Sequence, residues 1–182
     1  MKSRVILKFN IVDSTQTISK KIINKLSGSK LTPRYPFVII ARQQKTGYGR
    51  FKRKWRSPSG GLWFSIIIAP NSKFSYNNIA SVTSLIAKQL RQTLKKQYKI
   101  NTLIKLPNDI MYNNKKLAGC IVETEKHGTA LWAITGIGIN VNNPVPENLS
   151  QPAISLKSIL HKSVNIEKLL DSILQNLLPK IT

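Results

Sequence analysis

The chain has 182 residues, and its 41% hydrophobic content is enough for one domain with a substantial core, which argues against wholesale disorder. Lys and Arg outnumber Asp and Glu by 29 to 7, so the formal net charge is +22 and the isoelectric point is near 10.4. No stretch approaches the ~18 apolar residues of a membrane span, the basic start lacks the apolar run of a signal peptide, and one cysteine excludes an internal disulfide. A zinc site is disfavoured by the low count of cysteine and histidine, and a cytoplasmic location is expected.

The large positive charge has three explanations. Lysines are scattered along the whole chain, and Ile and Asn are abundant, which indicates compositional drift in a genome that favours A and T codons. A dedicated nucleic-acid surface is the second explanation, and attraction of an acidic substrate or partner is the third. The charge by itself therefore does not identify a partner.

The first part of the chain predicts a strand, a helix and two more strands. Residues 4–12 are rich in β-branched side chains and alternate in polarity. Asp13 or Ser14 would cap a helix whose apolar residues recur at helical spacing. "PFVIIARQQ" predicts the second strand, and "LWFSIIIAP" predicts a third that is buried on both faces because it is almost wholly apolar.

The second part predicts a helix over about residues 74–96, a series of short strands, and helices at the tail. Asn113-Asn114 and His127-Gly128 are expected to form turns, and the strands on either side of the second turn would pair antiparallel. This order of elements predicts an α+β domain with a mixed, largely antiparallel sheet and helices packed on one face.

The segment "TGYGRFKRKW", residues 46–55, has the composition of a ligand-binding loop. Glycine lets the backbone approach a ligand closely, arginine binds phosphate or carboxylate in a bidentate manner, and tryptophan offers a flat apolar face. The pattern matches neither a Walker loop nor a Rossmann turn, and an exposed, solvated basic loop is the alternative. Glycines and like charges oppose ordering, so we expect the empty loop to be mobile.

A second candidate is "KLPNDIMYNNKKLAG". Asn108 and Asp109 could hold Mg²⁺ through oxygen atoms, accept a proton from an amine, or simply form a turn. Lys116 enters an apolar strand, where it could balance the charge of a carboxylate or phosphate, although Lys115 and Lys116 could equally be solvated.

Small residues also interrupt the predicted strands. The two glycines of "TGIGIN" indicate a close contact with a ligand or with another part of the sheet. Cys120 lies in the apolar run "LAGCIVE" and is expected to be a core residue and not a nucleophile.

Four motifs together resemble the catalytic domain of biotin protein ligases. They are "DSTQ", "GYGRFKRKW", "KLPNDI", and "KKLAGCIVE" followed by "GIGIN", and they occur in the family's order between about residues 4 and 143. Their combination is far more specific than any one of them. The resemblance implies the fold of these ligases, which is similar to class II aminoacyl-tRNA synthetases, in one catalytic domain over residues 1–182.

The resemblance also implies a two-step reaction. The carboxylate of biotin would attack the α-phosphate of ATP with Mg²⁺ present, giving biotinyl-5′-AMP and pyrophosphate. A lysine of the biotin carboxyl carrier domain of acetyl-CoA carboxylase, or of another biotin-dependent carboxylase, would then attack this adenylate and release AMP. Two anions must meet in such a site, so fixed cations are required.

Matching the motifs residue by residue gives the implied roles. Residues implied for catalysis are Lys116, Arg50 and Asp109. Residues implied for biotin binding are Ser14, Thr15, Gln16, Gln44, Tyr48, Gly49, Arg50, Lys116, Gly119 and Gly138. Residues implied for ATP or adenylate binding are Arg50, Arg53, Trp55, Asn108, Lys116 and Asn140. Asn108 and Asp109 are implied as magnesium ligands.

The chain departs from the family pattern at two loop positions. The family loop usually reads "GRGRxGRxW", whereas Tyr48 stands here in place of the first arginine and Lys52 in place of the third glycine. Retention of the adenylate is therefore expected to be weaker. We expect no N-terminal DNA-binding domain, hence no specific DNA binding. We also expect no C-terminal β-barrel, which would mean either a minimal form or a truncated chain.

Three alternatives stay open. A lipoate ligase or octanoyl transferase of the same fold would use a similar pocket. A basic nucleic-acid-binding protein would need a basic face with exposed aromatic residues. An inactive relative is the third, because of Tyr48 and Lys52. A homodimer paired through sheet edges is compatible with the resemblance, and no membrane partner is expected.

Overall fold

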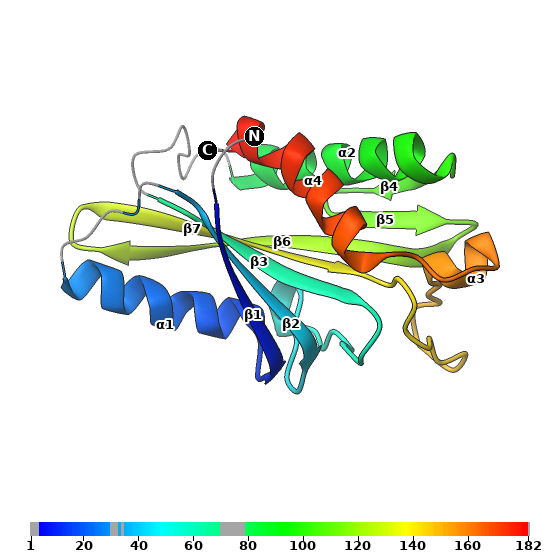
Figure 1. Ribbon diagram of the computed structural model, residues 1–182, viewed down its shortest axis with the longest axis horizontal. Coiled ribbons are helices and arrows are strands. Elements are labelled where there is room, and N and C mark those ends of the chain that lie inside the picture. The colour runs from blue at the N-terminus through cyan, green and yellow to red at the C-terminus, as the bar shows by residue number, and fades with distance from the viewer. Residues whose placement is uncertain (1–3, 30–32, 34, 70–78, 182) are drawn as a thin grey trace.

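One seven-stranded sheet organises the protein (Figure 1). The structure, a computed structural model, describes residues 4–29, 33, 35–69 and 79–181. In chain order the strands are β1 (Val5–Val12), β2 (Phe37–Gln44), β3 (Leu62–Ile68), β4 (Leu103–Lys105), β5 (Asp109–Tyr112), β6 (Lys115–His127) and β7 (Ala130–Ile139). The helices are α1 (Thr15–Gly28), α2 (Ile79–Tyr98), α3 (Leu156–Leu160) and α4 (Ile166–Ile181), with a short 3₁₀ helix η1 (Arg50–Lys52).

The sheet has the order β1-β2-β3-β7-β6-β5-β4 and is antiparallel except between β1 and β2. These two strands are parallel because α1 connects them as a crossover. The prediction of a mixed, largely antiparallel sheet is confirmed. Both predicted turns form hairpins, and the φ angles of Asn113, Asn114 and Gly128 are +46°, +61° and +60°, in the left-handed region that tight turns need.

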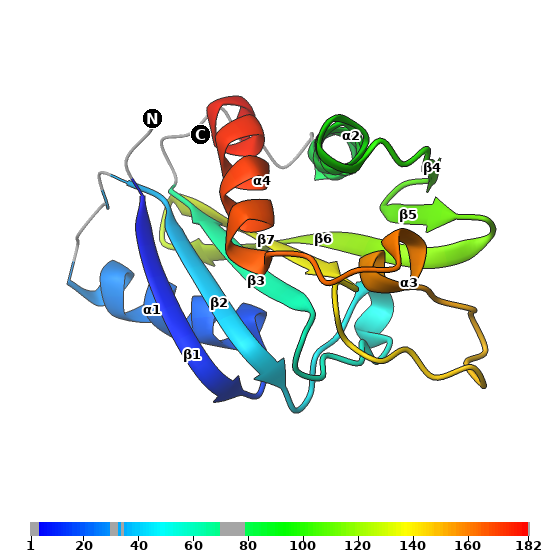
Figure 2. The same ribbon diagram turned by 45° about the vertical axis from the view of Figure 1, so that its right-hand side comes forward.

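Helices cover both faces of the sheet, so the prediction that they pack on one face was wrong. Figure 2 shows α1 on one side of the strands and α2 and α4 on the other. Ile23 of α1 packs with Ile67 of β3 in one apolar cluster, whereas Ile66 of β3 belongs to a larger cluster with α2 and α4. Every residue of β3 is buried, and successive side chains of a strand point to opposite faces. An apolar strand of this kind needs cover on both sides.

The remaining predicted elements agree with the structure where it describes them. Strands β1, β2 and β3 and helix α1 fall where the sequence placed them, and Ser14 is the N-cap of α1. The first part of the helix expected over residues 74–96 lies outside the described residues, and from Ile79 it continues to Tyr98. No helix in the described ranges is both long and apolar enough to cross a membrane.

Candidate functional site

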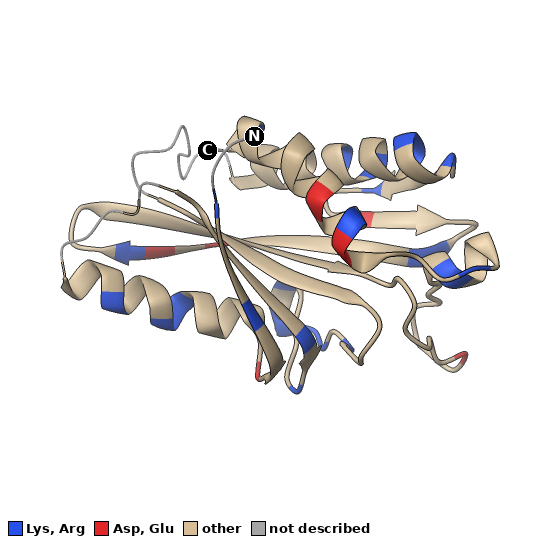
Figure 3. Ribbon diagram, in the orientation of Figure 1, with Lys and Arg blue, Asp and Glu red and all other residues tan. Residues whose placement is uncertain are grey.

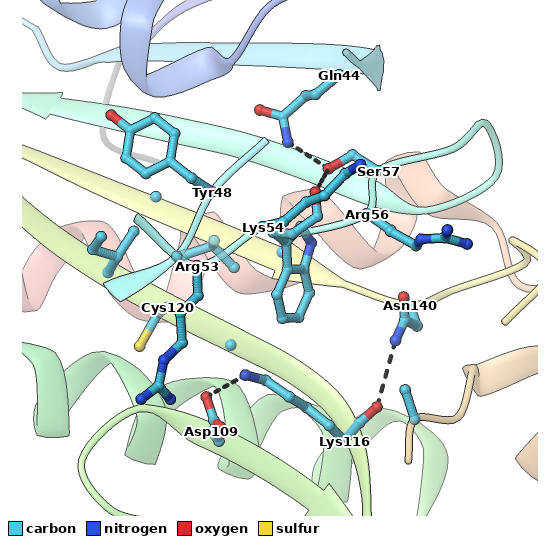
Figure 4. Close-up of a pocket in the computed structure, with 18 of the residues that line it drawn as sticks. Gln44, Tyr48, Arg53, Lys54, Arg56, Ser57, Asp109, Lys116, Cys120 and Asn140 are labelled. Carbon is cyan, nitrogen blue, oxygen red and sulfur yellow. Dashed lines mark hydrogen bonds and ion pairs between the residues drawn. The ribbon is translucent and has the colours of Figure 1, made fainter. Parts of the chain in front are cut away.

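A single large cavity brings the predicted site residues together. Its volume is about 1340 Å³, and residues at the N-terminal end of α1 line it together with residues of β6 and β7. Every residue predicted for catalysis, for ligand binding or for magnesium lines it. Figure 4 shows Gln44 and Ser57 on one side of the cavity and Lys116 and Asp109 on the other. Arg50 and Lys116, which are 66 positions apart (116 − 50), therefore face the same space.

The start of α1 and the end of β2 form a polar wall of the cavity. The Ser14 hydroxyl accepts hydrogen bonds from the backbone N–H groups of Gln16 (3.1 Å) and Thr17 (3.3 Å), which caps the helix. Gln44 accepts through Oε1 from the backbone N–H of Thr15 (2.8 Å) and donates through Nε2 to the Ser57 hydroxyl (2.7 Å). The orientation of the Gln44 amide is thus fixed before any ligand enters.

The glycine loop, residues 45–56, folds back on itself as an irregular hairpin. The backbone N–H of Gly49 donates to the carbonyl of Arg53 (2.8 Å), and that of Trp55 donates to the carbonyl of Gly47 (2.8 Å). Gly47 has no room for a side chain, because a Cβ there would lie 2.7 Å from the Ser57 hydroxyl oxygen. At the tip, Phe51 has a φ of +56° and is 77% exposed, and the guanidinium of Arg50 lies 5.0 Å from its ring centre.

The side chain of Trp55 packs the glycine loop against the sheet. Its indole lies edge-on to Trp63, with 6.3 Å between the ring centres. A Cβ on Gly138 would lie 2.7 Å from Cε2 of Trp55, and one on Gly119 would lie 3.4 Å from its Cζ3. Gly119 and Gly138 are paired across β6 and β7, so this glycine pair forms a depression in the sheet that receives the indole. Of the two glycines of "TGIGIN", Gly138 therefore makes room for the protein's own tryptophan, and both glycines line the cavity.

The cationic side of the cavity is built around Lys116. Its Nζ lies 2.8 Å from Oδ1 of Asp109 and 4.9 Å from the ring centre of Trp55. Arg50 reaches the same region and donates from Nη1 to Oδ1 of Asn108 at 3.5 Å. Asn108 is itself held by a 2.9 Å hydrogen bond from Nδ2 to the carbonyl of Cys120. Cations from the loop and from β6 are thus tied to the adjacent pair Asn108 and Asp109.

The backbone of Lys116 is fixed by a segment near the C-terminal helices. Its N–H donates to the carbonyl of Pro152 (2.8 Å), and its carbonyl accepts from the N–H of Ile154 (3.0 Å). Asn140 adds a contact from Nδ2 to the carbonyl of Lys116 at 3.4 Å (Figure 4). These bonds join the start of β6 to the end of β7 and to the chain that leads into α3.

Cys120 is a core residue, as predicted. It is buried among apolar residues under α2. Burial, reinforced by the negative charge of Asp109, raises the pKa of the Cys120 thiol to about 12. A thiol with such a pKa stays protonated at neutral pH, which is unfavourable for a nucleophile.

A magnesium ion has a partial ligand set here. Among the described residues no group of three His, Cys, Asp or Glu side chains could hold a metal ion. Asn108 and Asp109 nevertheless place one amide and one carboxylate in the cavity. Magnesium usually keeps several water ligands and binds to one or two carboxylates together with substrate phosphates. The pair therefore fits an ion held mainly by a triphosphate.

Several residues of the site were not predicted from the sequence. Ser57 lines the cavity beside Gln44, and the buried Ser65 donates to the Thr15 hydroxyl at 2.7 Å from behind the polar wall. Residues 143–146 and 149–151 line the opposite rim. Glu123 lies beneath the glycine loop, where it accepts hydrogen bonds from Gln16 and Tyr48. Glu123 ends the motif "KKLAGCIVE". Residues two apart in a strand point to the same face, so the spacing of Gly119, Ile121 and Glu123 could have predicted that Glu123 faces the site.

The fold and site define a class of protein with a large cavity, lined by Arg50, Arg53 and Lys116, over one mixed sheet. The model of the biotin/lipoate A/B protein ligase family matches residues 9–140. The chain therefore belongs to this family.

Individual relatives agree with the family match. The chain is 30% identical over 161 residues to the bifunctional ligase/repressor BirA of Bacillus subtilis, covering 86% of this chain and 47% of that protein. It is 27% identical over 164 residues to the biotin–[acetyl-CoA-carboxylase] ligase of Paracoccus denitrificans, covering 87% and 65%. The chain thus spans only about half to two thirds of the length of these curated relatives.

A solved structure agrees in fold. The biotin protein ligase of Aquifex aeolicus in complex with biotin and ATP superimposes with a TM-score of 0.77 at 29% identity, covering 96% of this chain and 69% of that one. The similarity extends over nearly the whole chain.

Proposed function

We propose that the chain is a biotin protein ligase that activates biotin with ATP to biotinyl-5′-AMP and then transfers biotin to a lysine of a carrier protein. The observation that carries the proposal is the convergence of Arg50 and Lys116, from two separated segments, with the polar wall around Thr15 and Gln44 in one cavity. A site of this kind can hold a neutral hydrogen-bonding ring at one side and neutralise two anions at the other.

The polar wall suits the ureido ring of biotin, which carries one carbonyl acceptor and two N–H donors. Ser14, Thr15 and Gln44 provide hydroxyl and amide groups that are buried or half-buried and fixed by neighbours. Ser65 fixes the Thr15 hydroxyl in turn. Preorganised groups of this kind reduce the entropy lost when a ligand binds.

In the first step the biotin carboxylate forms a bond to the α-phosphorus of ATP, and the bond from that phosphorus to the pyrophosphate oxygen breaks. The ammonium of Lys116 and the guanidinium of Arg50 neutralise the carboxylate and the growing phosphoryl charge. Arg53, which also lines the cavity, and Asn140 are assigned to the nucleotide. Magnesium bound with ATP would be held by Asn108 and Asp109 and would neutralise phosphate charge.

Water must be kept from the adenylate, because a mixed anhydride hydrolyses readily. The glycine loop and the indole of Trp55 cover the cationic side of the cavity. Closure of a site around a reactive intermediate prevents such side reactions. Arg50, at the start of the exposed loop tip, is assigned to hold the adenylate inside.

In the second step a lysine amine attacks the carbonyl carbon of the adenylate, the carbon–oxygen bond to phosphate breaks, and AMP leaves while the amine loses a proton. Asp109 is the carboxylate nearest to Lys116, at 2.8 Å, and is assigned to accept this proton. The name of the Paracoccus relative points to acetyl-CoA carboxylase as the source of the carrier domain.

The test is incubation of the chain with ATP, Mg²⁺, labelled biotin and a biotin carboxyl carrier domain, followed by mass measurement of the carrier. We expect a mass increase of one biotin that depends on ATP and on the target lysine. A parallel reaction with lipoate separates biotin from lipoate ligation, since the family contains both activities. The proposal would be refuted if the chain transferred lipoate and not biotin. It would also be refuted if the chain formed neither biotinylated carrier nor biotinyl-5′-AMP.

A further inference from the structure

Tyr48 and Lys52, the two residues of the glycine loop that differ from the family pattern, both contact Glu123. This acid has no role in the reaction proposed above. The hydroxyl of Tyr48 donates to Oε2 of Glu123 at 2.9 Å. Nζ of Lys52 lies 3.5 Å from Oε1 of Glu123 and 4.1 Å from the ring centre of Tyr48. Glu123 lies on β6, so the loop is tied to the sheet through the two residues that differ from the family.

The same carboxylate also holds the start of α1. Nε2 of Gln16 donates to Oε2 of Glu123 at 2.9 Å, and Nζ of Lys20 lies 3.6 Å from Oε1. One oxygen of Glu123 thus accepts two neutral hydrogen bonds, while the other faces two ammonium groups. Its side chain is only 18% exposed, so these interactions are partly shielded from water.

Glu123 determines which way the Gln16 amide points. An ionised carboxylate only accepts hydrogen bonds, so Gln16 must turn its NH₂ group toward Glu123. Its Oε1 then lies 3.1 Å from the place a Cβ on Gly136 would occupy, and it is buried without a hydrogen-bond partner among the described residues. Both Gln16 and Gly136 line the cavity. Buried acceptors usually have a partner, so this unpaired oxygen at the wall of the cavity would gain one if a donor on the ligand reached it.

The Tyr48 hydroxyl likewise acts only as a hydrogen-bond donor toward Glu123. Burial, followed by the hydrogen bond to Glu123 and its charge, raises the pKa of Tyr48 above its ordinary value. The hydroxyl therefore stays protonated over the whole physiological range and can keep donating to the carboxylate.

We propose that Glu123 is a positioning residue for biotin: it fixes Tyr48 of the glycine loop and Gln16 of α1 against the biotin side of the cavity before the ligand binds. The inference rests on the proposed function for the identity of the ligand. In this chain the anchoring by Tyr48 and Lys52 orders a loop whose glycines and like charges would otherwise oppose order.

The first test follows the loop without any ligand. Amide hydrogen exchange of a peptide covering residues 45–57 is compared between the unmodified chain and the variants Tyr48→Phe and Glu123→Gln. We expect the exchange to be about tenfold faster in both variants, since each loses an interaction that holds the loop. Glu125→Gln is the matched control, because Glu125 pairs with Lys20 at 3.0 Å on the same strand and makes no described contact with the loop.

The second test follows the ligand. In Tyr48→Phe and Glu123→Gln the KM for biotin should rise about three- to tenfold, while kcat for adenylate formation stays within about twofold, as expected when binding geometry is lost and the reacting groups are intact. The double variant should be no worse than Glu123→Gln, because the hydrogen bond that Tyr48→Phe removes is one of those that Glu123→Gln already weakens. A general loss of stability would not produce this non-additivity.

Unchanged loop exchange in Tyr48→Phe, or an equal effect of Glu125→Gln, would overturn the inference. Tyr48→Phe removes one oxygen atom only, so the test stands even if Glu123→Gln fails to fold. The exchange measurement needs no ligand, so it decides the anchoring role independently of whether the unmodified chain ligates biotin.

Discussion

At the scale of single residues, neighbours on one strand have opposite surroundings. Lys115 and Lys116 are adjacent in β6, and successive side chains of a strand point to opposite faces. Lys115 is exposed, whereas the Lys116 side chain is 17% exposed and paired with Asp109. Desolvation strengthens the field of a cation, so only Lys116 is placed to stabilise developing charge.

Lys116→Ala removes this fixed cation from the cavity. We expect adenylate formation to slow by a factor of about 10² to 10³, the usual cost of losing one preorganised charge stabiliser. Single-turnover formation of biotinyl-AMP measures the effect, with Lys115→Ala as the matched control that should leave the rate unchanged. Formation at the unmodified rate in Lys116→Ala would refute the role.

Arg50→Ala tests retention of the intermediate as a separate property. Arg50 contacts Asn108 across the cavity at 3.5 Å, so its loss should open a route for the adenylate to leave. We expect free biotinyl-AMP in solution, and labelling of unrelated lysines, to rise at least about fivefold, because a contact with a charged group is worth on the order of 1.5 kcal/mol or more. Arg42→Ala is the control, since Arg42 is exposed on β2 and does not line the cavity. Equal leakage from both variants would contradict the prediction.

At the scale of elements, the site depends on strands β6 and β7, which carry the glycines Gly119 and Gly138 where the glycine loop contacts them. Gly138 of β7 lies between Trp63 of β3 and Gly119 of β6. Isolated glycines in a strand often mark a close approach by another segment. Here that segment is Trp55, so the sheet and the glycine loop fit together through one indole.

Gly138→Ala should disturb this fit without unfolding the sheet. The new Cβ would lie 2.7 Å from two atoms of the Trp55 ring, which must move, whereas the backbone of Gly138 does not have a positive φ and accepts alanine. We expect binding of a biotinyl-adenylate analogue to weaken by about tenfold or more, with a change in tryptophan emission. Gly28→Ala, at a site with nothing within 4 Å, should change neither quantity. Unaltered binding in Gly138→Ala would show that Trp55 is not part of the site.

At the scale of the whole molecule, positive charge is spread over both helical layers and the loops (Figure 3). Seven acidic residues cannot neutralise 29 basic ones. Acids nonetheless occupy structural positions: Glu167 and Asp171 of α4 pair with Lys8 and Arg4, which joins α4 to β1. The remaining charge repels itself, and such repulsion destabilises a compact state.

Salt should therefore stabilise the folded protein. Raising NaCl from about 20 to 300 mM shortens the screening length from roughly 20 Å to less than 8 Å, which weakens the self-repulsion more than the close ion pairs. We expect the unfolding temperature to rise by about 2–4 °C for each kcal/mol gained, measured by calorimetry. KCl at equal ionic strength should act in the same way. A fall in the unfolding temperature would mean that attractive pairs dominate.

Most elements could be predicted from the sequence because local periodicity and turn chemistry encode them. Asn113-Asn114 forms a hairpin since both residues tolerate positive φ, and Ser14 caps α1 through its own hydroxyl. The motifs also placed every predicted site residue on the cavity. These features depend on residues close in sequence, or on several motifs that occur in a fixed order.

What only the tertiary structure decided concerns contacts between distant segments. Strand register and the choice of facing surfaces determine three such contacts. They are the packing of helices on both faces of β3, the contact of Trp55 with Gly138, and the hydrogen bond from Tyr48 to Glu123. A register shift of one residue would turn each of these side chains to the opposite face. Composition and spacing do not specify that register by themselves, because it is the packing of the whole core that selects it.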